Sequence, residues 1–148
     1  MDLILWRHAE AKSGGRDRER KLTCKGEKQA TRVAAWLRKR LPRGAKVLVS
    51  PARRAQQTAR ALTTKFRTVA AMDVSASPGG LLAAAGWPKG KGVVVVVGHQ
   101  PTLGAAAAAA MTGAEADWNI KKGSCWWFAQ RKRDQSTVLR AVISPDLV

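Results

Sequence analysis

Two histidines follow directly after apolar segments, at points where a strand would end. His8 comes after residues 3–7, and His99 comes after the valine run 93–97 and one glycine. Ligands of open α/β sheets bind outside the carboxyl ends of the strands, so these two distant residues are expected to meet in one site. A neutral imidazole is a good nucleophile for phosphorus and can hold a phosphoryl group as a covalent intermediate.

Arginines accompany the first histidine and a second predicted strand end. Arg7 precedes His8, and the pair Arg53 and Arg54 follows the apolar segment 46–49. A guanidinium offers a fork of donors to the non-bridging oxygens of a phosphoryl group. The amino end of a helix also favours a bound anion. Helical spacing alone does not decide which arginine of the pair points inward, but the residue types predict a phosphoryl-binding site.

Alternating strands and helices must position these residues. Apolar segments predict strands over 2–7, 46–49, 68–74 and 93–97, and a C-terminal hairpin with strands over 125–128 and 138–143. Start and stop signals predict three helices: one from the N-cap Thr23 to Pro42, one capped by Ser50 with Pro51 at its first position, and one from Pro101 to 112–113. Residues 78–90 predict a loop or a short helix. The alternation predicts a three-layer α/β sandwich, with residues 1–148 as a single domain.

The chain carries a formal net charge of +17, concentrated in its first part. Residues 1–67 hold 19 Lys and Arg against 5 Asp and Glu. Such a field attracts anionic ligands, and it would equally support a basic nucleic-acid-binding protein. Proteins that bind single-stranded nucleic acid place aromatic residues among the basic ones, so that bases can stack on them. Here Trp118, Trp126 and Trp127 lie outside the most basic part of the chain. We therefore expect no specific nucleic acid as a partner, and nucleic-acid binding remains the alternative of another class.

Cysteine usage and the N-terminus favour a cytoplasmic protein. Cys24 and Cys125 are far apart and form no metal-binding or disulfide pattern, so we expect neither a disulfide framework nor a metal site. The N-terminal apolar run stops at Arg7, which argues against a signal peptide. Glycine and proline interrupt the uncharged segment 93–114, so we expect a strand followed by a helix there and no membrane association.

Four ordered motifs resemble those of the histidine phosphatase superfamily, and within it the short SixA-like phosphohistidine phosphatases. They are Arg7-His8-Ala9-Glu10-Ala11, Asp17 with Arg20 and Leu22-Thr23 through Gly26, Ser50-Pro51 with Arg54-Ala55 and Gln57-Thr58, and Gly98-His99 with Pro101. The superfamily also contains the phosphoglycerate mutases. The resemblance therefore implies a phosphoglycerate-mutase-like α/β/α sandwich, with a mainly parallel sheet and a C-terminal antiparallel hairpin.

The resemblance also implies roles for individual residues. His8 would be the phosphorylated nucleophile, and Arg7, Arg54 and His99 would complete the pocket for phosphate or another oxyanion. It thereby selects Arg54 from the arginine pair. Arg20 is a further candidate for phosphate binding. The family uses no metal and no organic cofactor, so none is expected.

One departure from the larger family members bears on the substrate. Those members place a carboxylic acid beyond the second strand–helix unit, yet no Asp or Glu lies between Asp73 and Glu115. An alkoxide is a poor leaving group without a proton, whereas the imidazole of phosphohistidine has a reference pKa of about 6.5. This favours an N–P bond over an alkyl phosphate ester, in agreement with the resemblance to the short phosphohistidine phosphatases, and argues against mutase activity. The expected partner is therefore a phosphorylated protein, such as a histidine-phosphotransfer domain. The alternative is a small-molecule phosphomonoesterase on the same scaffold, for which Glu10 is the candidate acid.

Overall fold

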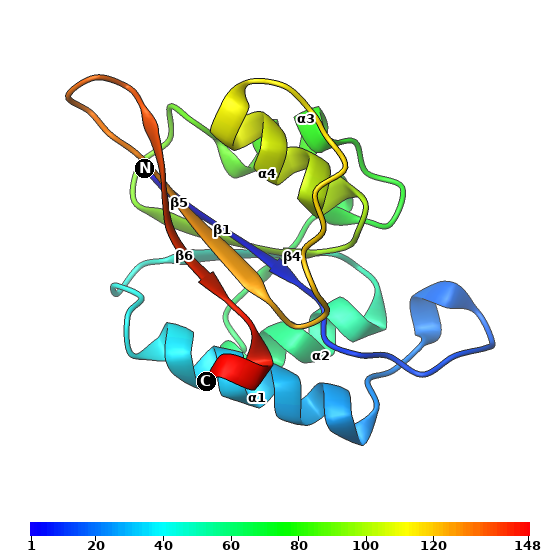
Figure 1. The fold of residues 1–148 in the computed structure, drawn as a ribbon. Coiled ribbons are helices and arrows are strands. Elements are labelled where there is room, and N and C mark those ends of the chain that lie inside the picture. The colour runs from blue at the N-terminus through cyan, green and yellow to red at the C-terminus, as the bar shows by residue number, and fades with distance from the viewer.

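The structure, a computed structural model, describes residues 1–148 and contains one six-stranded sheet between two layers of helices (Figure 1). The strands are β1 (Asp2–Arg7), β2 (Lys46–Val49), β3 (Arg67–Thr68), β4 (Val93–Gly98), β5 (Cys125–Gln130) and β6 (Thr137–Ile143). Their order across the sheet is β3-β2-β4-β1-β5-β6. The first four strands in this order are parallel to one another. Strand β5 runs antiparallel to both of its neighbours, β1 and β6. The mainly parallel sheet and the C-terminal hairpin are therefore confirmed.

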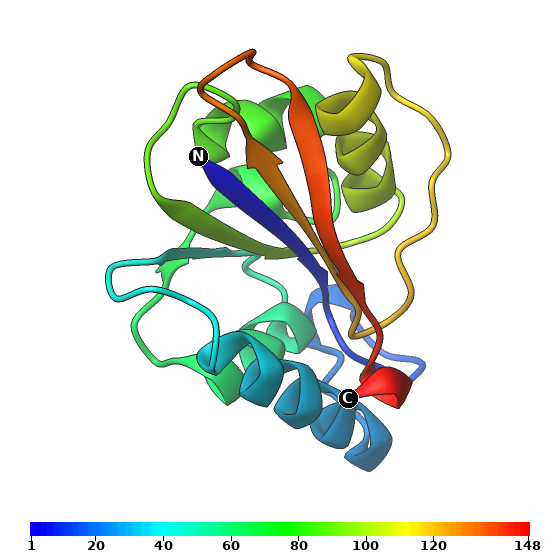
Figure 2. The same cartoon turned by 60° about the vertical axis from the view of Figure 1, so that its left-hand side comes forward.

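Helices cover both faces of this sheet. Helices α1 (Cys24–Arg38) and α2 (Arg53–Leu62) lie on one face, and α3 (Pro78–Ala85) and α4 (Thr102–Thr112) lie on the other, as the turned view makes clear (Figure 2). The chain also contains three short 3₁₀ helices: η1 (Asp17–Glu19), η2 (Ala70–Met72) and η3 (Pro145–Leu147). The arrangement is the predicted three-layer α/β/α sandwich.

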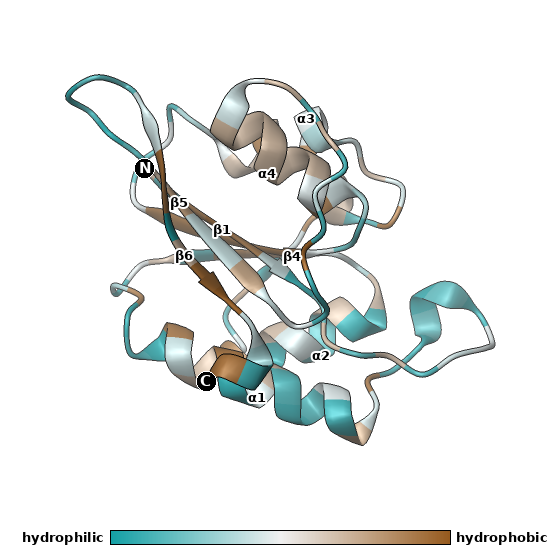
Figure 3. Cartoon of the chain, in the orientation of Figure 1, coloured by the Kyte–Doolittle hydropathy of each residue, from teal (hydrophilic) through white to brown (hydrophobic).

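The side chains of β1 alternate between two hydrophobic cores. Leu3 and Leu5 pack with the cluster beneath α3 and α4, while Ile4 and Trp6 pack with the cluster beneath α1 and α2. All four side chains are fully buried. Because helices cover both faces, the strand is apolar throughout rather than alternately polar. Figure 3 shows the same pattern, with apolar strands inside and a hydrophilic loop after β1.

The register of β1 and β4 brings the two histidines together. Arg7 is the parallel partner of Gly98, and the backbone N–H of His8 donates to the carbonyl of Gly98 at 3.1 Å. His8 and His99 therefore leave the sheet at neighbouring strand ends. This is the juxtaposition that the two apolar segments predicted.

Two local predictions were wrong. The strand predicted over 68–74 is only Arg67–Thr68, because the chain turns into η2 after Val69 and buries Met72 in the core beneath β4. Ser50 does not cap the second helix, which begins at Arg53 after the N-cap Ala52. The Ser50 hydroxyl instead accepts the N–H of Ala52 at 3.1 Å, and Pro51 lies in the turn before the helix.

Other segments follow the prediction more closely. Of the two interpretations of residues 78–90, the short helix is the one found, with the Ser77 hydroxyl accepting the N–H of Gly80 at 3.0 Å. Thr23 caps α1 as expected by accepting the N–H of Gly26 at 2.9 Å. A side chain at Gly26 would collide with the backbone of Glu10, so α1 packs closely against the loop after β1 only because this position is glycine. No helix of the chain combines the length and the apolar character needed to cross a lipid bilayer.

Candidate active site

Backbone and side-chain contacts fix the ring of His8 at the carboxyl end of β1. Its Nδ1 lies 2.7 Å from the carbonyl oxygen of Ala9 and therefore donates its proton there. The N–H of Ala9 in turn donates to the Thr58 hydroxyl at 3.1 Å, and that hydroxyl donates to the carbonyl of Arg54 at 2.7 Å. This chain of contacts orients the imidazole and leaves the lone pair on Nε2.

Arg54, from the first turn of α2, donates a hydrogen bond to that lone pair. Its Nε donates to Nε2 of His8 at 3.2 Å, while Nη1 and Nη2 donate to the backbone and the carboxylate of Asp17 at 2.7 and 3.2 Å. The residue is 4% exposed, whereas Arg53 is exposed to solvent. The structure therefore turns Arg54, and not Arg53, towards the two histidines.

His99 faces His8 from the end of β4. The two ring centroids are 5.2 Å apart, and Nε2 of His99 lies 2.7 Å from the hydroxyl of Ser50, the residue that follows β2. Nδ1 of His99 is buried and has no hydrogen-bond partner. Three neighbouring strand ends thus contribute side chains to one site.

Two further arginines surround the histidines. Arg7 donates from Nη1 to the carbonyl of Ile120 at 2.9 Å, while its buried Nε has no partner. Arg20, in the loop after β1, donates to the carboxylate of Asp17 at 3.3 and 3.1 Å and to the carbonyl of Lys12 at 2.9 Å. Asp17 therefore holds Arg20 and Arg54 together on one side of the site.

The three arginines and Asp17 line one cavity of about 350 Å³, which we call the phosphate pocket. Its charged residues are four cations and one carboxylate: Arg7, Arg20, Arg54, Lys122 and Asp17. Both histidines line it as well. Because cations outnumber the carboxylate, the pocket is suited to an oxyanion. The chain contains no group of three or more His, Cys, Asp or Glu side chains arranged for a metal ion.

Burial keeps both imidazoles neutral. Burial, helped by the charges of His99, Arg54 and Arg7 and opposed by the hydrogen bond to the Ala9 carbonyl, lowers the pKa of His8 to about 3. Burial likewise lowers the pKa of His99 to about 4, helped by Arg54 and opposed by Asp73. At neutral pH, Nε2 of His8 is therefore unprotonated and nucleophilic.

Three carboxylates lie in or near the site, and they differ in what they contact. Glu10 accepts the hydroxyl of Thr23 at 2.8 Å and does not line the phosphate pocket. Asp73 does not line it either and pairs with Arg18 at 2.5 Å. Only Asp17 lines it. Burial raises the pKa of Asp17, but hydrogen bonds from Arg20 and Arg54 outweigh this effect and leave the pKa below its usual value.

Several contacting residues received no role from sequence reasoning. Ser50 was expected only as a helix cap, yet its hydroxyl meets His99. Asp17 and Thr58 stood inside recognised motifs without an assigned contact. Lys122 lies in a loop that carried no signal beyond its charge, and only the fold brings it to the pocket.

The fold and the cavity together define an α/β protein with a cationic, histidine-containing oxyanion pocket at the carboxyl edge of its sheet. The model of the histidine phosphatase superfamily (branch 1) matches residues 3–76, which run from β1 through η2 and include His8 and Arg54. The chain therefore belongs to the histidine phosphatase superfamily. This membership, together with the structural neighbours described next, shows that it is a phosphatase.

Solved structures share the fold over almost the whole chain. The protein histidine phosphatase SixA, solved with tungstate, superposes with a TM-score of 0.82 at 22% identity and covers 99% of both chains. A protein assigned as the phosphohistidine phosphatase SixA of Nakamurella multipartitia gives 0.78 at 27% identity, covering 97% of this chain and 95% of its own. A phosphoserine phosphatase mutant of Entamoeba histolytica gives 0.72 at 16% identity, covering 97% of each. No curated protein sequence matches the chain.

Proposed function

We propose that this phosphatase removes the phosphoryl group from phosphohistidine in a protein, through a covalent intermediate on His8. One observation carries the proposal: an unprotonated Nε2 faces a cationic pocket whose only lining carboxylate is paired with two arginines. The nucleophile is unprotonated, but the pocket holds no carboxylic acid that could protonate the leaving group. Imidazole is a leaving group that can depart under these conditions.

The proposed reaction takes place in two displacements. Nε2 of His8 attacks phosphorus as the N–P bond of the substrate breaks, and the substrate ring, which carries a proton on its other nitrogen, takes the electron pair of that bond and leaves as neutral imidazole. Water then attacks the phosphoryl group on His8, releases phosphate and returns the electron pair to Nε2. Arg7, Arg54 and Arg20 bind the phosphoryl oxygens in both steps, and His99 contributes a further polar contact.

The comparison with solved structures supports this substrate class. The Nakamurella protein, at 27% identity over nearly the whole length of both chains, bears the name of a phosphohistidine phosphatase. Tungstate in the other SixA structure is an oxyanion, the kind of ligand that the phosphate pocket suits. A small-molecule phosphomonoesterase remains the second candidate, because the phosphoserine phosphatase has the same fold and Asp17 puts a carboxylate in the pocket.

A substrate comparison tests the proposal. A phosphorylated histidine-phosphotransfer domain, phosphoramidate and an alkyl phosphate are each offered to the enzyme, and kcat/KM is measured by phosphate release. We expect turnover of both N–P substrates and little turnover of the alkyl ester. Preferential hydrolysis of the alkyl phosphate would reject the proposal and favour the phosphomonoesterase.

A further inference from the structure

A second cavity of about 590 Å³ opens beside the phosphate pocket. We call it the basic groove. Arg7 and Lys122 line both cavities, so the groove continues directly from the site where the phosphoryl group would bind. Its remaining charged residues are Lys25, Lys28, Arg32, Lys121, Glu10 and Asp146.

Apart from Arg7, the cations of the basic groove come from two parts of the chain, which form its two walls. Lys25, Lys28 and Arg32 are three and four residues apart on α1, a spacing that places them on one helix face. Lys121 and Lys122 lie in the loop before β5 and line the same cavity. Figure 1 shows this loop and η3 beside α1.

Apart from Arg7, which donates to the carbonyl of Ile120, the cations of this groove have no internal partners. The five lysine and arginine residues of the two walls are exposed, and none of them takes part in an ion pair of the chain. A row of unpaired cations is costly in self-repulsion unless an anionic partner meets it. The row is much longer than one phosphoryl group, so the single anion of the phosphate pocket does not account for it.

We propose that the basic groove docks an acidic surface of the phosphorylated protein while its phosphohistidine enters the phosphate pocket. The proposal rests on the proposed function and adds where the rest of the substrate lies. Two observations favour protein over nucleic acid. No aromatic side chain lines the groove to stack a base, and Glu10 and Asp146 interrupt the positive row, which suits a surface of mixed charge better than a uniform row of phosphates.

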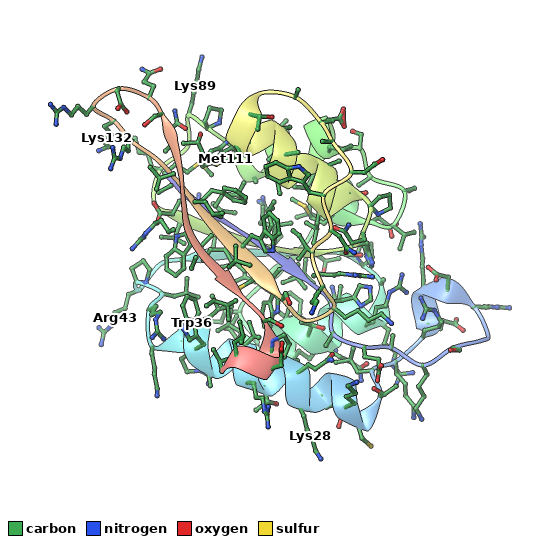
Figure 4. The ribbon with its side chains drawn as sticks, viewed as in Figure 1. Lys28, Trp36, Arg43, Lys89, Met111 and Lys132 are labelled. Carbon is green, nitrogen blue, oxygen red and sulfur yellow. The ribbon has the colours of Figure 1, made fainter.

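A charge-reversal variant tests the docking without touching the phosphate pocket. The triple variant Lys25→Glu, Lys28→Glu and Arg32→Glu changes only exposed positions of α1. Glutamate has a helix propensity close to that of lysine and is favourable near the amino end of a helix, so the variant is expected to fold. The matched control is Lys89→Glu, Lys91→Glu and Lys132→Glu, which changes the net charge equally. Figure 4 places Lys28 on α1 and both Lys89 and Lys132 at the opposite end of the molecule.

Two substrates separate docking from chemistry. A phosphorylated histidine-phosphotransfer domain would use both cavities, whereas phosphoramidate would use only the phosphate pocket. We expect the groove variant to lose about tenfold or more in kcat/KM for the domain, mainly through slower association, and to retain its rate with phosphoramidate. The control variant should keep both activities. Added salt should lower the kcat/KM of the parent for the domain, and it should lower that of the groove variant less.

Several results would overturn the docking proposal. They are an unchanged kcat/KM for the domain in the groove variant, an equal loss with phosphoramidate, and an equal loss in the control variant. Nucleic acid is the occupant instead if the parent binds a DNA duplex, the groove variant does not, and domain turnover is unaffected. Failure of the proposed function looks different, because the parent itself would then hydrolyse phosphoramidate or esters but not the phosphorylated domain.

Discussion

The guanidinium of Arg54 donates from Nε to Nε2 of His8 across 3.2 Å. The same arginine reaches Asp17 through both terminal nitrogens, so it links the proposed nucleophile to the loop after β1. Since Nδ1 of His8 already donates to Ala9, Nε2 accepts, and Arg54 holds the tautomer that the proposed attack on phosphorus requires. In the proposed reaction, the same donor would contact the non-bridging oxygens of the phosphoryl group.

Arg54→Ala is expected to give a folded enzyme with kcat lower by about a hundredfold to a thousandfold, because a preorganised donor to the transition state is removed. Arg54→Lys should recover only part of this loss, since an ammonium cannot contact His8 and Asp17 together as a planar fork does. Steady-state kinetics with phosphoramidate measure the effect, and circular dichroism checks folding. A fully active Arg54→Lys enzyme would contradict the role assigned to the fork.

His8→Ala is expected to abolish both turnover and phosphoenzyme formation. The phosphoenzyme of the parent is trapped with a labelled phosphoryl donor, and its label should be stable in alkali and labile in acid. His99→Ala is the matched variant, because it removes the facing imidazole but keeps the nucleophile. It should still become labelled, only more slowly. Undiminished labelling of His8→Ala would exclude His8 as the nucleophile.

Thr58 is expected to position His8 without touching the substrate, because its hydroxyl contacts the Ala9 backbone whose carbonyl holds Nδ1. Thr58→Val leaves the Ala9 N–H buried without an acceptor, which costs about 1–3 kcal/mol of unfolding free energy. It should also lower kcat more than it raises KM. Thr58→Ser restores the hydroxyl and should restore kcat. Equal kcat values for the valine and serine variants would show that the contact does not position the ring.

The buried histidines are expected to make stability fall as the solution becomes acidic. Their folded pKa values of about 3 and about 4 lie below the ordinary value of 6.5, so the unfolded chain binds protons first as the pH falls. Their contribution is complete above about pH 6.5 and is lost towards the folded pKa values. Between pH 7 and pH 5 each histidine should cost about 2 kcal/mol of unfolding free energy.

Urea unfolding in phosphate-free buffer measures this loss, since a bound oxyanion would stabilise the folded protein separately. His99→Gln should show about half the decrease of the parent, because one of the two groups no longer titrates. The window from pH 7 to pH 5 lies above the ordinary pKa of the carboxyl groups and thus isolates the imidazoles. A stability that is constant across it would contradict the depressed pKa values.

Sequence reasoning reached the architecture and the convergence of the histidines because these depend on strong local signals. The five consecutive valines 93–97 strongly favour a buried strand, because β-branched residues are typical of strands covered on both faces. Residues at the ends of neighbouring parallel strands then lie close together. It failed at residues 68–74, where small residues are compatible with several conformations and the burial of Met72 decides the outcome. It also missed the contact between Ser50 and His99, because a serine before a proline is equally well explained as a helix cap.

The dependence on the leaving group separates the two enzymatic functions. The only carboxylate lining the phosphate pocket is Asp17, whose lowered pKa keeps it ionised, so the pocket holds no carboxylic acid that could protonate an alkoxide. We expect kcat/KM to be high for phosphohistidine and for esters of acidic phenols, and to fall steeply as the pKa of the leaving group rises towards that of an alcohol.

Glu10→Gln and Asp17→Asn are each measured over the same series of esters. Glu10→Gln should leave the slope unchanged because its carboxylate is bound to Thr23. Asp17→Asn should lower all rates together by loosening Arg20 and Arg54. A shallow slope in the parent that steepens in one of these variants would identify that residue as the general acid and favour the small-molecule phosphomonoesterase.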